Sequence, residues 1–539
     1  KKEDNVNNNI LYDHEMQTFN NVDKYKGVQT QDVKKEDGKE NMKCKTFIKK
    51  LMHKQNYATL CDLQESDHLL SADNTLMEIM SSSKDTKIKS ASSKSAISTA
   101  STEIENVENN YINILEISEK IIAINNYKVN LAKYQDIKPP STAGISGIFD
   151  IDYSDQDEMF HLEELWRLES DETNKNVTSI NLNPKNEFIL AITHGNYDKF
   201  RTEDYGLVSC WSLKNIEHPK RMHQFSTGVI SCDFSKKNPN ILAIGLHDGR
   251  IILFDVTLDE NPVVLDNMNN PDKNIGIIWK LCWVIIEEKN DVIKLENLYS
   301  ASQDGRITYW DKEKRFEAND IMLMKRAPIR KTNQKLTNSE IGKSELENQF
   351  LTGYTGAISM DFNKDNNKLY LVGTEDGSVQ LCSISHNEQY LQTYYYHTAP
   401  INKIVWSPFN SDIFITASSD WTICIWSKHN DEPIVCLHGT KPVLDVIWSP
   451  STSTLIASIT SETLNIWDMT ENLLDPITTN NAPPNSKYTC IKFNHDGKSI
   501  YVGTSVGVVY LYSLVGLSDK SLNNNSKQLK AILESKKIN

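Results

Sequence analysis

The sequence predicts an all-β fold built from repeated sheet modules and preceded by a long polar region. Residues 401–426 contain the clearest module. Apolar and polar residues alternate over 401–406, 413–417 and 422–426, and an alternation of period two places every second side chain on one face of a sheet. Ser419 and Asp420 provide a turn before the last of these segments. Similar segments recur along the chain, which is typical of a repeat protein.

One position in the third strand of the module marks each repeat. The seven marker residues are Trp211, Phe254, Trp310, Cys382, Trp426, Trp467 and Tyr512. Their successive spacings are 43, 56, 72, 44, 41 and 45 residues, and four of these agree with a period of ~40–45 residues. The two long spacings contain a charged insertion at 285–296 and a polar insertion at 312–349.

Each repeat also opens with an alternating strand. These strands begin at residues 177, 229, 279, 357, 401, 443 and 488. Seven such units fit a closed ring, which protects the strand edges that an open sheet would expose. We expect residues 160–169, which precede the first repeat, to supply the outer strand of the last module and so close the ring.

The fifth repeat resembles one blade of a WD40 β-propeller, so the predicted fold is a seven-bladed WD40 propeller. In that family a histidine, a hydroxyl, an aspartate and a tryptophan form a buried hydrogen-bond relay. The matching residues here are His397, Thr416, Asp420 and Trp426. The third repeat keeps Ser300, Asp304 and Trp310 but has no histidine at the matching place, and the second keeps only Asp248.

A hydroxyl, a histidine and an aspartate could instead form a nucleophilic site. The hydroxyl and the aspartate, however, stand four residues apart around one hairpin, at positions that recur between blades. Buried polar groups need partners, so we interpret the set as a structural relay and expect no catalytic residues.

Composition narrows the class of protein further. The chain has 539 residues and a net charge of −14, which argues against a general nucleic-acid or anionic-membrane binder. Its nine cysteines show no C-x-x-C pair, and its 13 histidines are dispersed, so we expect reduced thiols and no metal site. No apolar run approaches the ~20 residues that span a bilayer. These features predict a soluble intracellular protein that uses no cofactor. It begins at Lys1 without a methionine or a signal-like segment, so we expect the natural N-terminus to be missing.

Residues 1–158 differ from the repeats because they are rich in Asn, Lys, Ser and Glu. We expect this region to be mostly disordered and to bind partners, followed by the propeller at 159–516 and a C-terminal tail at 517–539. Residues 81–102 are interpreted as a flexible tether, with a phosphorylated segment as the alternative. An amphipathic helix is predicted at about 110–134, and its apolar stripe could pack against another chain or against the propeller.

Two short motifs in this region are similar to the peptide that dynein light chains of the LC-eight class bind. The stronger motif contains Lys26, Val28, Gln29 and Thr30, and the weaker one contains Gln17 and Thr18. Such a peptide adds a strand to a sheet edge, and two copies on one chain would bind a dimeric partner bivalently.

Together these features resemble a dynein intermediate chain, which has a light-chain-binding N-terminal half and a WD40 propeller. Within that family the finer similarity is to the axonemal intermediate chain of the two-headed inner arm f. Residues 400–426 and 442–450 carry the resemblance to the family, and residues 16–20, 28–29, 206–215, 387–391 and 475–476 carry the finer similarity. The region 31–158 matches poorly.

The resemblance implies a non-catalytic scaffold of the ciliary or flagellar axoneme that regulates motility. Its propeller would hold a dynein heavy-chain tail, and its N-terminal half would bind light chains and a second intermediate chain, with cytoplasmic pre-assembly before contact with doublet microtubules. The sequence has no G-x-x-x-x-G-K-[ST] phosphate loop. The alternatives are an outer-arm intermediate chain, a WD40 adaptor of ciliary transport or of a ubiquitin ligase, and a propeller enzyme with carboxylates converging on the channel.

Overall fold

The computed structural model describes most of the repeat region and one helical segment before it. The described residues are 114–115, 117–135, 160–169, 175–196, 205–258, 262–287, 294–311, 316–326, 353–387, 389–470, 474–516 and 529. The segment 1–101 lies outside the described residues.

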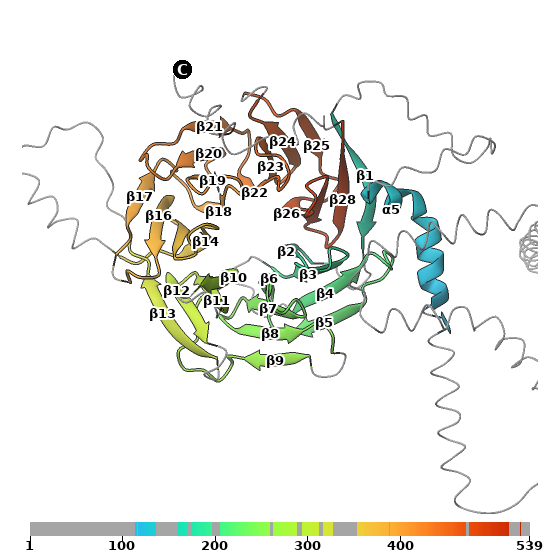
Figure 1. The fold of residues 1–539 in the computed structure, drawn as a ribbon, viewed down its shortest axis with the longest axis horizontal. Coiled ribbons are helices and arrows are strands. Elements are labelled where there is room, and N and C mark those ends of the chain that lie inside the picture. The colour runs from blue at the N-terminus through green and yellow to red at the C-terminus, as the bar shows by residue number, and fades with distance from the viewer. Residues whose placement is uncertain are drawn as a thin grey trace, which may run out of the picture. The chain divides into compact units, whose positions relative to one another are not determined.

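Seven four-stranded antiparallel sheets form the described fold (Figure 1). Blade one contains β2 (Val177–Leu182), β3 (Ile189–His194), β4 (Gly206–Ser212) and β5 (Arg221–Phe225). Blade two contains β6 (Val229–Phe234), β7 (Ile241–Leu246), β8 (Ile251–Asp255) and β9 (Val263–Asp266). Blade three contains β10 (Ile278–Glu287), β11 (Lys294–Ser302), β12 (Arg306–Asp311) and β13 (Glu317–Leu323). Blade four contains β14 (Ala357–Phe362), β15 (Leu369–Thr374), β16 (Ser378–Ser383) and β17 (Gln392–Tyr395).

The remaining blades follow the same order. Blade five contains β18 (Ile401–Trp406), β19 (Ile413–Ser418), β20 (Thr422–Ser427) and β21 (Val435–His438). Blade six contains β22 (Val443–Trp448), β23 (Leu455–Thr460), β24 (Thr463–Asp468) and β25 (Thr478–Asn481). Blade seven contains β26 (Tyr488–Phe493), β27 (Ser499–Thr504), β28 (Val509–Val515) and, as its outer strand, β1 (His161–Leu168).

The blades close into a ring. The innermost strands contact one another in the cyclic order β2, β6, β10, β14, β18, β22, β26 and back to β2. The last blade is completed from the start of the domain, because β1 pairs antiparallel with β28 from His161 opposite Val515 to Leu168 opposite Val509. The predicted seven-bladed β-propeller and its closing strand are therefore confirmed.

The core lies between neighbouring blades. Each predicted marker residue lies on the third strand of its blade, and each is buried. Around Trp426, for example, the ring of Phe414 stacks at a centroid distance of 6.0 Å and that of Tyr394 meets it edge-on at 5.6 Å. Truncating a buried tryptophan to alanine costs about 3–5 kcal/mol. One buried side chain on the third strand of each blade, aromatic in every blade except the fourth, is thus what the sequence pattern detects.

The charged insertion at 285–296 lengthens two strands of blade three. Its ends lengthen β10 and β11, where Ile285 pairs with Glu296. The carboxylate of Glu296 accepts hydrogen bonds from blade two, including one from the Ser235 hydroxyl at 2.6 Å. On the other side, Asn367 of blade four donates to the carbonyl of Ile285 at 2.6 Å. The lengthened hairpin therefore joins blade three to both neighbours.

The polar insertion predicted at 312–349 also contains a strand of the ring. Its residues Glu317–Leu323 form β13, the outer strand of blade three. Alternation is weak in this strand because it lies at the edge, where exposed residues are tolerated.

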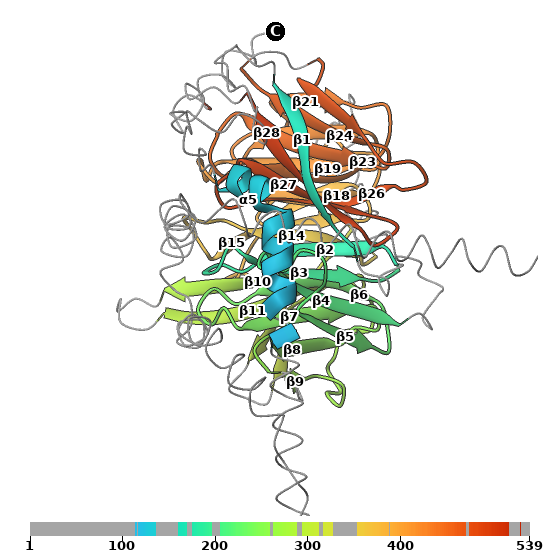
Figure 2. The same cartoon turned by 90° about the vertical axis from the view of Figure 1, so that its right-hand side faces the viewer.

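The predicted helix at about 110–134 is helical at 117–126 and again in α5 (Lys128–Tyr134), with a turn at Tyr127. Its C-terminal part docks on the propeller beside β1 (Figure 2). Tyr134 is buried there, with its ring 5.5 Å from that of Trp166 and its hydroxyl 3.1 Å from that of Tyr501. The sequence left open whether the helix packs against another chain or against the propeller. Its C-terminal end packs against the propeller.

The other end of the helical segment presents its apolar residues to solvent. Four of them are exposed, namely Ile114, Leu115, Ile121 and Ile122. In the C-terminal tail, Leu529 is fully buried within the core cluster that contains Trp467. No helix among the described residues is long and apolar enough to cross a membrane.

Candidate functional site

The four polar side chains singled out in the fifth blade lie in one hydrogen-bonded chain. Nδ1 of His397 lies 3.0 Å from a carboxylate oxygen of Asp420 in the β19–β20 turn. Its Nε2 lies 2.7 Å from the hydroxyl oxygen of Thr416 on β19. The indole N–H of Trp426 on β20 donates to the same hydroxyl oxygen at 2.9 Å. The structure thus brings all four together.

The direction of these hydrogen bonds follows from the indole, which can only donate. The Thr416 oxygen accepts that proton, so its own hydroxyl proton is available to Nε2 of His397. Nδ1 then carries the ring proton and donates to Asp420. Thr416 is 0% exposed, and so is the side chain of His397. A hydroxyl sealed from solvent cannot meet a substrate, so the arrangement offers no reactive nucleophile.

The charge on Asp420 gives the relay a pH dependence. Burial by itself raises the pKa of this carboxyl, but hydrogen bonds from His397 and Thr422 outweigh it and hold the pKa well below its usual value. A carboxylate with a depressed folded-state pKa stabilises the fold above its unfolded pKa, and that contribution is lost as the pH falls through the folded value.

We therefore expect Asp420→Asn to destabilise the protein at neutral pH and to lose that disadvantage as the pH falls below about 4, the unfolded pKa of an aspartate. Urea unfolding of the unsubstituted protein and of this variant, over a series of pH values, measures the difference. A difference that stays constant from neutral to acid pH would contradict the assignment of the charge to Asp420.

The third blade contains a related chain with an amide in place of the histidine. The indole of Trp310 donates to the Ser300 hydroxyl at 2.9 Å, and the side-chain amide of Asn274 donates to it at 3.2 Å. Asp304 accepts the backbone N–H of Ile275 at 3.1 Å. Asn274 precedes the first strand of its blade by four residues, as His397 does. Counting back four residues from the start of the first strand would therefore have identified Asn274 in the sequence.

Two further tryptophan–hydroxyl pairs were missed by the sequence reasoning. In blade one, the Trp211 indole donates to Ser209 at 3.1 Å, and Nε2 of His194 lies 3.2 Å from the same hydroxyl. Burial lowers the pKa of His194 to about 4, so this imidazole is neutral at neutral pH. In blade six, Trp467 donates to Ser458 at 2.9 Å. A hydroxyl nine or ten residues before the tryptophan is the shared signal in blades three, five and six.

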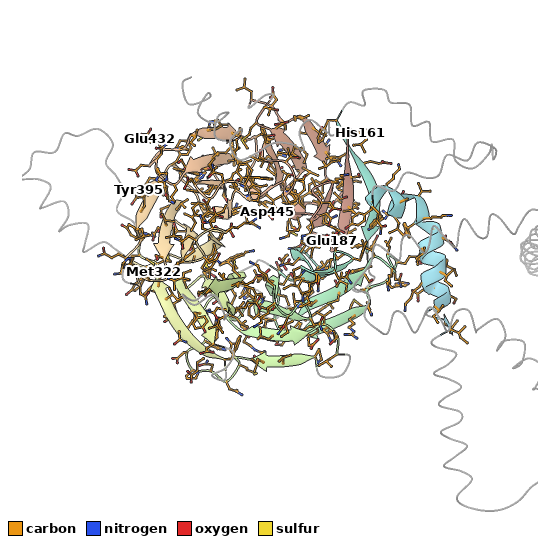
Figure 3. All side chains as sticks on the ribbon, viewed as in Figure 1. His161, Glu187, Met322, Tyr395, Glu432 and Asp445 are labelled. Carbon is orange, nitrogen blue, oxygen red and sulfur yellow. The ribbon has the colours of Figure 1, made fainter. Side chains whose placement is uncertain are left out.

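The ring encloses a cavity of about 170 Å³ that is lined by residues of all seven inner strands. Charged residues of both signs line it, namely Lys280, Asp361, Lys403, Asp445 and Lys492. The ammonium of Lys403 lies 3.0 Å from Asp445, and Figure 3 shows Asp445 near the centre of the ring. A propeller enzyme would need carboxylates that converge on the channel, but the sequence pattern did not identify the charged residues that line this cavity. They occupy the third or fifth position of an inner strand.

The carboxylates of the inner strands are already engaged by the next blade. Each of three accepts a backbone N–H from the following inner strand: Trp283 to Asp233 at 2.8 Å, Trp406 to Asp361 at 2.7 Å, and Ile491 to Asp445 at 3.2 Å. These contacts join blades two to three, four to five and six to seven. The geometry therefore favours a role in holding neighbouring blades together over general acid–base work.

Replacing Asp361 by Leu is expected to destabilise the propeller by about 1–3 kcal/mol, because the buried N–H of Trp406 would lose its acceptor. Urea unfolding measures this cost. Asp365→Ala, an exposed aspartate four residues away, is the matched control and should change stability by less than about 0.5 kcal/mol. Equal effects of the two substitutions would argue against the inter-blade contact.

Metal ligation has no candidate within the described ranges, where no three His, Cys, Asp or Glu side chains are grouped as an ion would require. The residues proposed for light-chain binding lie outside the described residues; they are Gln17, Thr18, Lys26, Val28, Gln29 and Thr30.

A closed ring of seven four-stranded blades with tryptophan–hydroxyl relays defines a WD-repeat β-propeller protein. The family described as "WD domain, G-beta repeat" matches residues 388–427, which run through β20 of the fifth blade. More particularly, about two thirds of the chain is similar to axonemal dynein intermediate chains.

The three relatives described next are all named as dynein intermediate chains. "Dynein axonemal intermediate chain 4" of Rattus norvegicus is 34% identical over 66% of this chain and 44% of that protein. The protein of the same name from Xenopus laevis is 36% identical over 64% of this chain and 46% of its own length. "Dynein intermediate chain 2, ciliary" of Heliocidaris crassispina is 27% identical over 66% of this chain and 50% of that protein. The chain thus spans about half the length of these relatives.

Proposed function

We propose that this protein is a non-catalytic intermediate chain of an axonemal dynein. The observation that carries the proposal is the similarity to "Dynein axonemal intermediate chain 4", which extends over 66% of the chain in the rat relative. A closed, rigid ring supports it, because such a ring is a platform for other subunits. The relay and channel polar groups would then serve stability, since their partners lie within the ring.

The finer proposal is an inner-arm complex of the f type. Similar runs at residues 206–215, which include β4, and at residues 387–391 support it. Within such a complex the propeller would hold a heavy-chain tail, while light chains and a second intermediate chain would bind to the N-terminal half.

The domain boundaries follow from this reading. We place the partner-binding region at 1–158, the propeller at 159–516 and the tail at 517–539. Assembly in the cytoplasm would precede transport to the axoneme, where the complex contacts the doublet microtubule. ATP hydrolysis would belong to the heavy chain.

Affinity purification of the tagged full chain from demembranated cilia, followed by mass spectrometry, tests this function. We expect a dynein heavy chain and light chains to be recovered in constant proportion to the tagged chain. The inner-arm proposal additionally requires the heavy chains of a two-headed inner arm. Recovery of a ubiquitin ligase or a transport train without any heavy chain would refute the motor assignment.

The light-chain motifs give a separate prediction. A peptide covering residues 10–34 is expected to bind an LC-eight dynein light chain in solution, and Gln29→Ala with Thr30→Ala should weaken that binding at least about tenfold, because alternate side chains of an added strand fill pockets. Isothermal titration calorimetry measures the affinity. The control changes Asp32 and Glu36, which lie outside the motif. It uses a longer peptide that contains both residues. Unchanged binding after the double substitution would rule out the stronger motif.

A further inference from the structure

Two thiols face each other on the outer strands of blade five. Cys424 on β20 and Cys436 on β21 are opposite each other in the antiparallel register. Their sulfur atoms lie 3.1 Å apart, and both cysteines are free. Neither side chain is a member of the relay formed by His397, Thr416, Asp420 and Trp426, and neither lines the channel cavity.

The backbone places this pair where a disulfide can form. The N–H of Gly439 donates to the carbonyl of Trp421 at 2.7 Å, which marks that opposed pair as a hydrogen-bonded one. Hydrogen-bonded and non-hydrogen-bonded pairs alternate along an antiparallel ladder, so Cys424, three positions along, belongs to a non-hydrogen-bonded pair. Such pairs have Cα atoms ~4.5 Å apart, within the range that a disulfide spans.

The two thiols differ in access and in acidity. Cys424 is fully buried, and burial raises its pKa. Cys436 is partly exposed on the outermost strand of the blade. The hydrogen bond from Cys424 lowers the pKa of the Cys436 thiol against the opposing effect of burial. The thiolate is the reactive form, so Cys436 is the accessible nucleophile and Cys424 is the thiol placed to resolve its oxidised product.

We propose that Cys424 and Cys436 form a redox-modification site whose oxidant is a hydroperoxide. The Cys436 thiolate attacks a peroxide oxygen, so that an S–O bond forms, the O–O bond breaks and hydroxide leaves to take up the thiol proton as water. The Cys424 sulfur then attacks the sulfenic sulfur of Cys436, the S–S bond forms and a second water leaves. In total two thiols lose two electrons and hydrogen peroxide is reduced to two waters.

The bridge would tie the edge strand of blade five to the strand that carries the relay. Cys424 lies two residues from Thr422, whose hydroxyl is 3.1 Å from Nδ1 of His397. The carbonyl oxygen of Cys424 lies 3.4 Å from the hydroxyl oxygen of Thr416. Oxidation at this pair would therefore cross-link the blade beside its buried polar chain.

Peptide mapping of the oxidised full chain tests the proposal. The protein is treated with hydrogen peroxide and then denatured in the presence of N-ethylmaleimide, which alkylates the thiols that remain free. Trypsin then cuts after Lys428 and so separates the two cysteines into different peptides. We expect a disulfide-linked pair of peptides containing Cys424 and Cys436, and recovery of both alkylated peptides after dithiothreitol. Full alkylation of both thiols after peroxide, or a bridge from either to another cysteine, would overturn the proposal.

Two variants assign the roles. In Cys424→Ser the resolving thiol is absent, so Cys436 should accumulate as a sulfenic acid that dimedone traps; absence of the adduct would refute Cys436 as the attacking thiol. Cys382→Ser, at a buried cysteine of the neighbouring blade, is the matched control and should leave the bridge unchanged. The mapping of the unsubstituted chain stands whether or not a variant folds.

Discussion

Replacing Leu165, Trp166 and Leu168 together by alanine is expected to open the propeller. All three side chains are on β1, each is at most 3% exposed, and each packs in the cluster that joins β1 to blades seven and one. Truncation of a buried leucine costs about 2–5 kcal/mol and that of a tryptophan about 3–5 kcal/mol. The sum approaches or exceeds the total stability of a typical domain, about 5–15 kcal/mol. Urea unfolding and size-exclusion chromatography measure the loss.

The same strand supplies the control for this experiment. Glu164 is exposed on β1 and pairs with β28 through its backbone. Glu164→Ala should change the free energy of unfolding by less than about 0.5 kcal/mol. If the triple variant remained a stable monomer with an unfolding midpoint like that of Glu164→Ala, the closing strand would have no role in stabilising the ring.

Replacing Thr416 by valine is expected to cost about 2–6 kcal/mol, although the two side chains have nearly the same shape. The hydroxyl is the common partner of His397 and Trp426. Its loss leaves a buried ring nitrogen and a buried indole N–H unpaired, and each unsatisfied group costs about 1–3 kcal/mol. Chemical unfolding monitored by tryptophan fluorescence measures the change.

Two matched substitutions separate the relay from packing. Thr416→Ser keeps the hydroxyl and loses one methyl group, so it should cost only about 1 kcal/mol. Thr393→Val removes a buried hydroxyl that has no hydrogen-bond partner among the described residues, so it should be neutral or stabilising. Equal costs for valine at 416 and at 393 would show that the relay adds nothing to stability.

The ring could be predicted because its determinants are local in sequence. A buried residue such as Trp310 or Trp426 recurs once per blade at a spacing that strand and turn lengths set. Even Cys382 and Phe254 could be assigned to third strands from that spacing, without a tryptophan. The closing strand was also predictable, since the last repeat supplies only three strands and leaves the outer edge of β28 unpaired until another strand joins it.

Features that depend on contacts between blades could not be predicted in the same way. Asp233 and Asp361 are ordinary polar residues in their strands, and only the ring brings the N–H groups of Trp283 and Trp406 to them. The opposition of Cys424 and Cys436 depends on the length of the turn between β20 and β21, which varies among blades.

The helical segment shows a different limit. An apolar stripe indicates that a helix face will be buried but not what will cover it. Tyr134, at the end of the predicted helix, anchors the segment on Trp166 and Tyr501. A pattern of hydrophobic residues cannot predict that the hydroxyl of Tyr134 will contact that of Tyr501.

The pairing of β1 with β28 has a consequence for biosynthesis. A ribosome releases β1 first and β28 last, with 340 intervening residues between Leu168 and Val509. Blade seven therefore cannot be completed during translation of the earlier blades, and the nascent chain must keep its first strand unpaired until almost the whole domain has emerged. Over that interval the exposed edge of β1 is open to wrong pairing. A molecular chaperone that covers it would have the greatest effect on the yield of native protein.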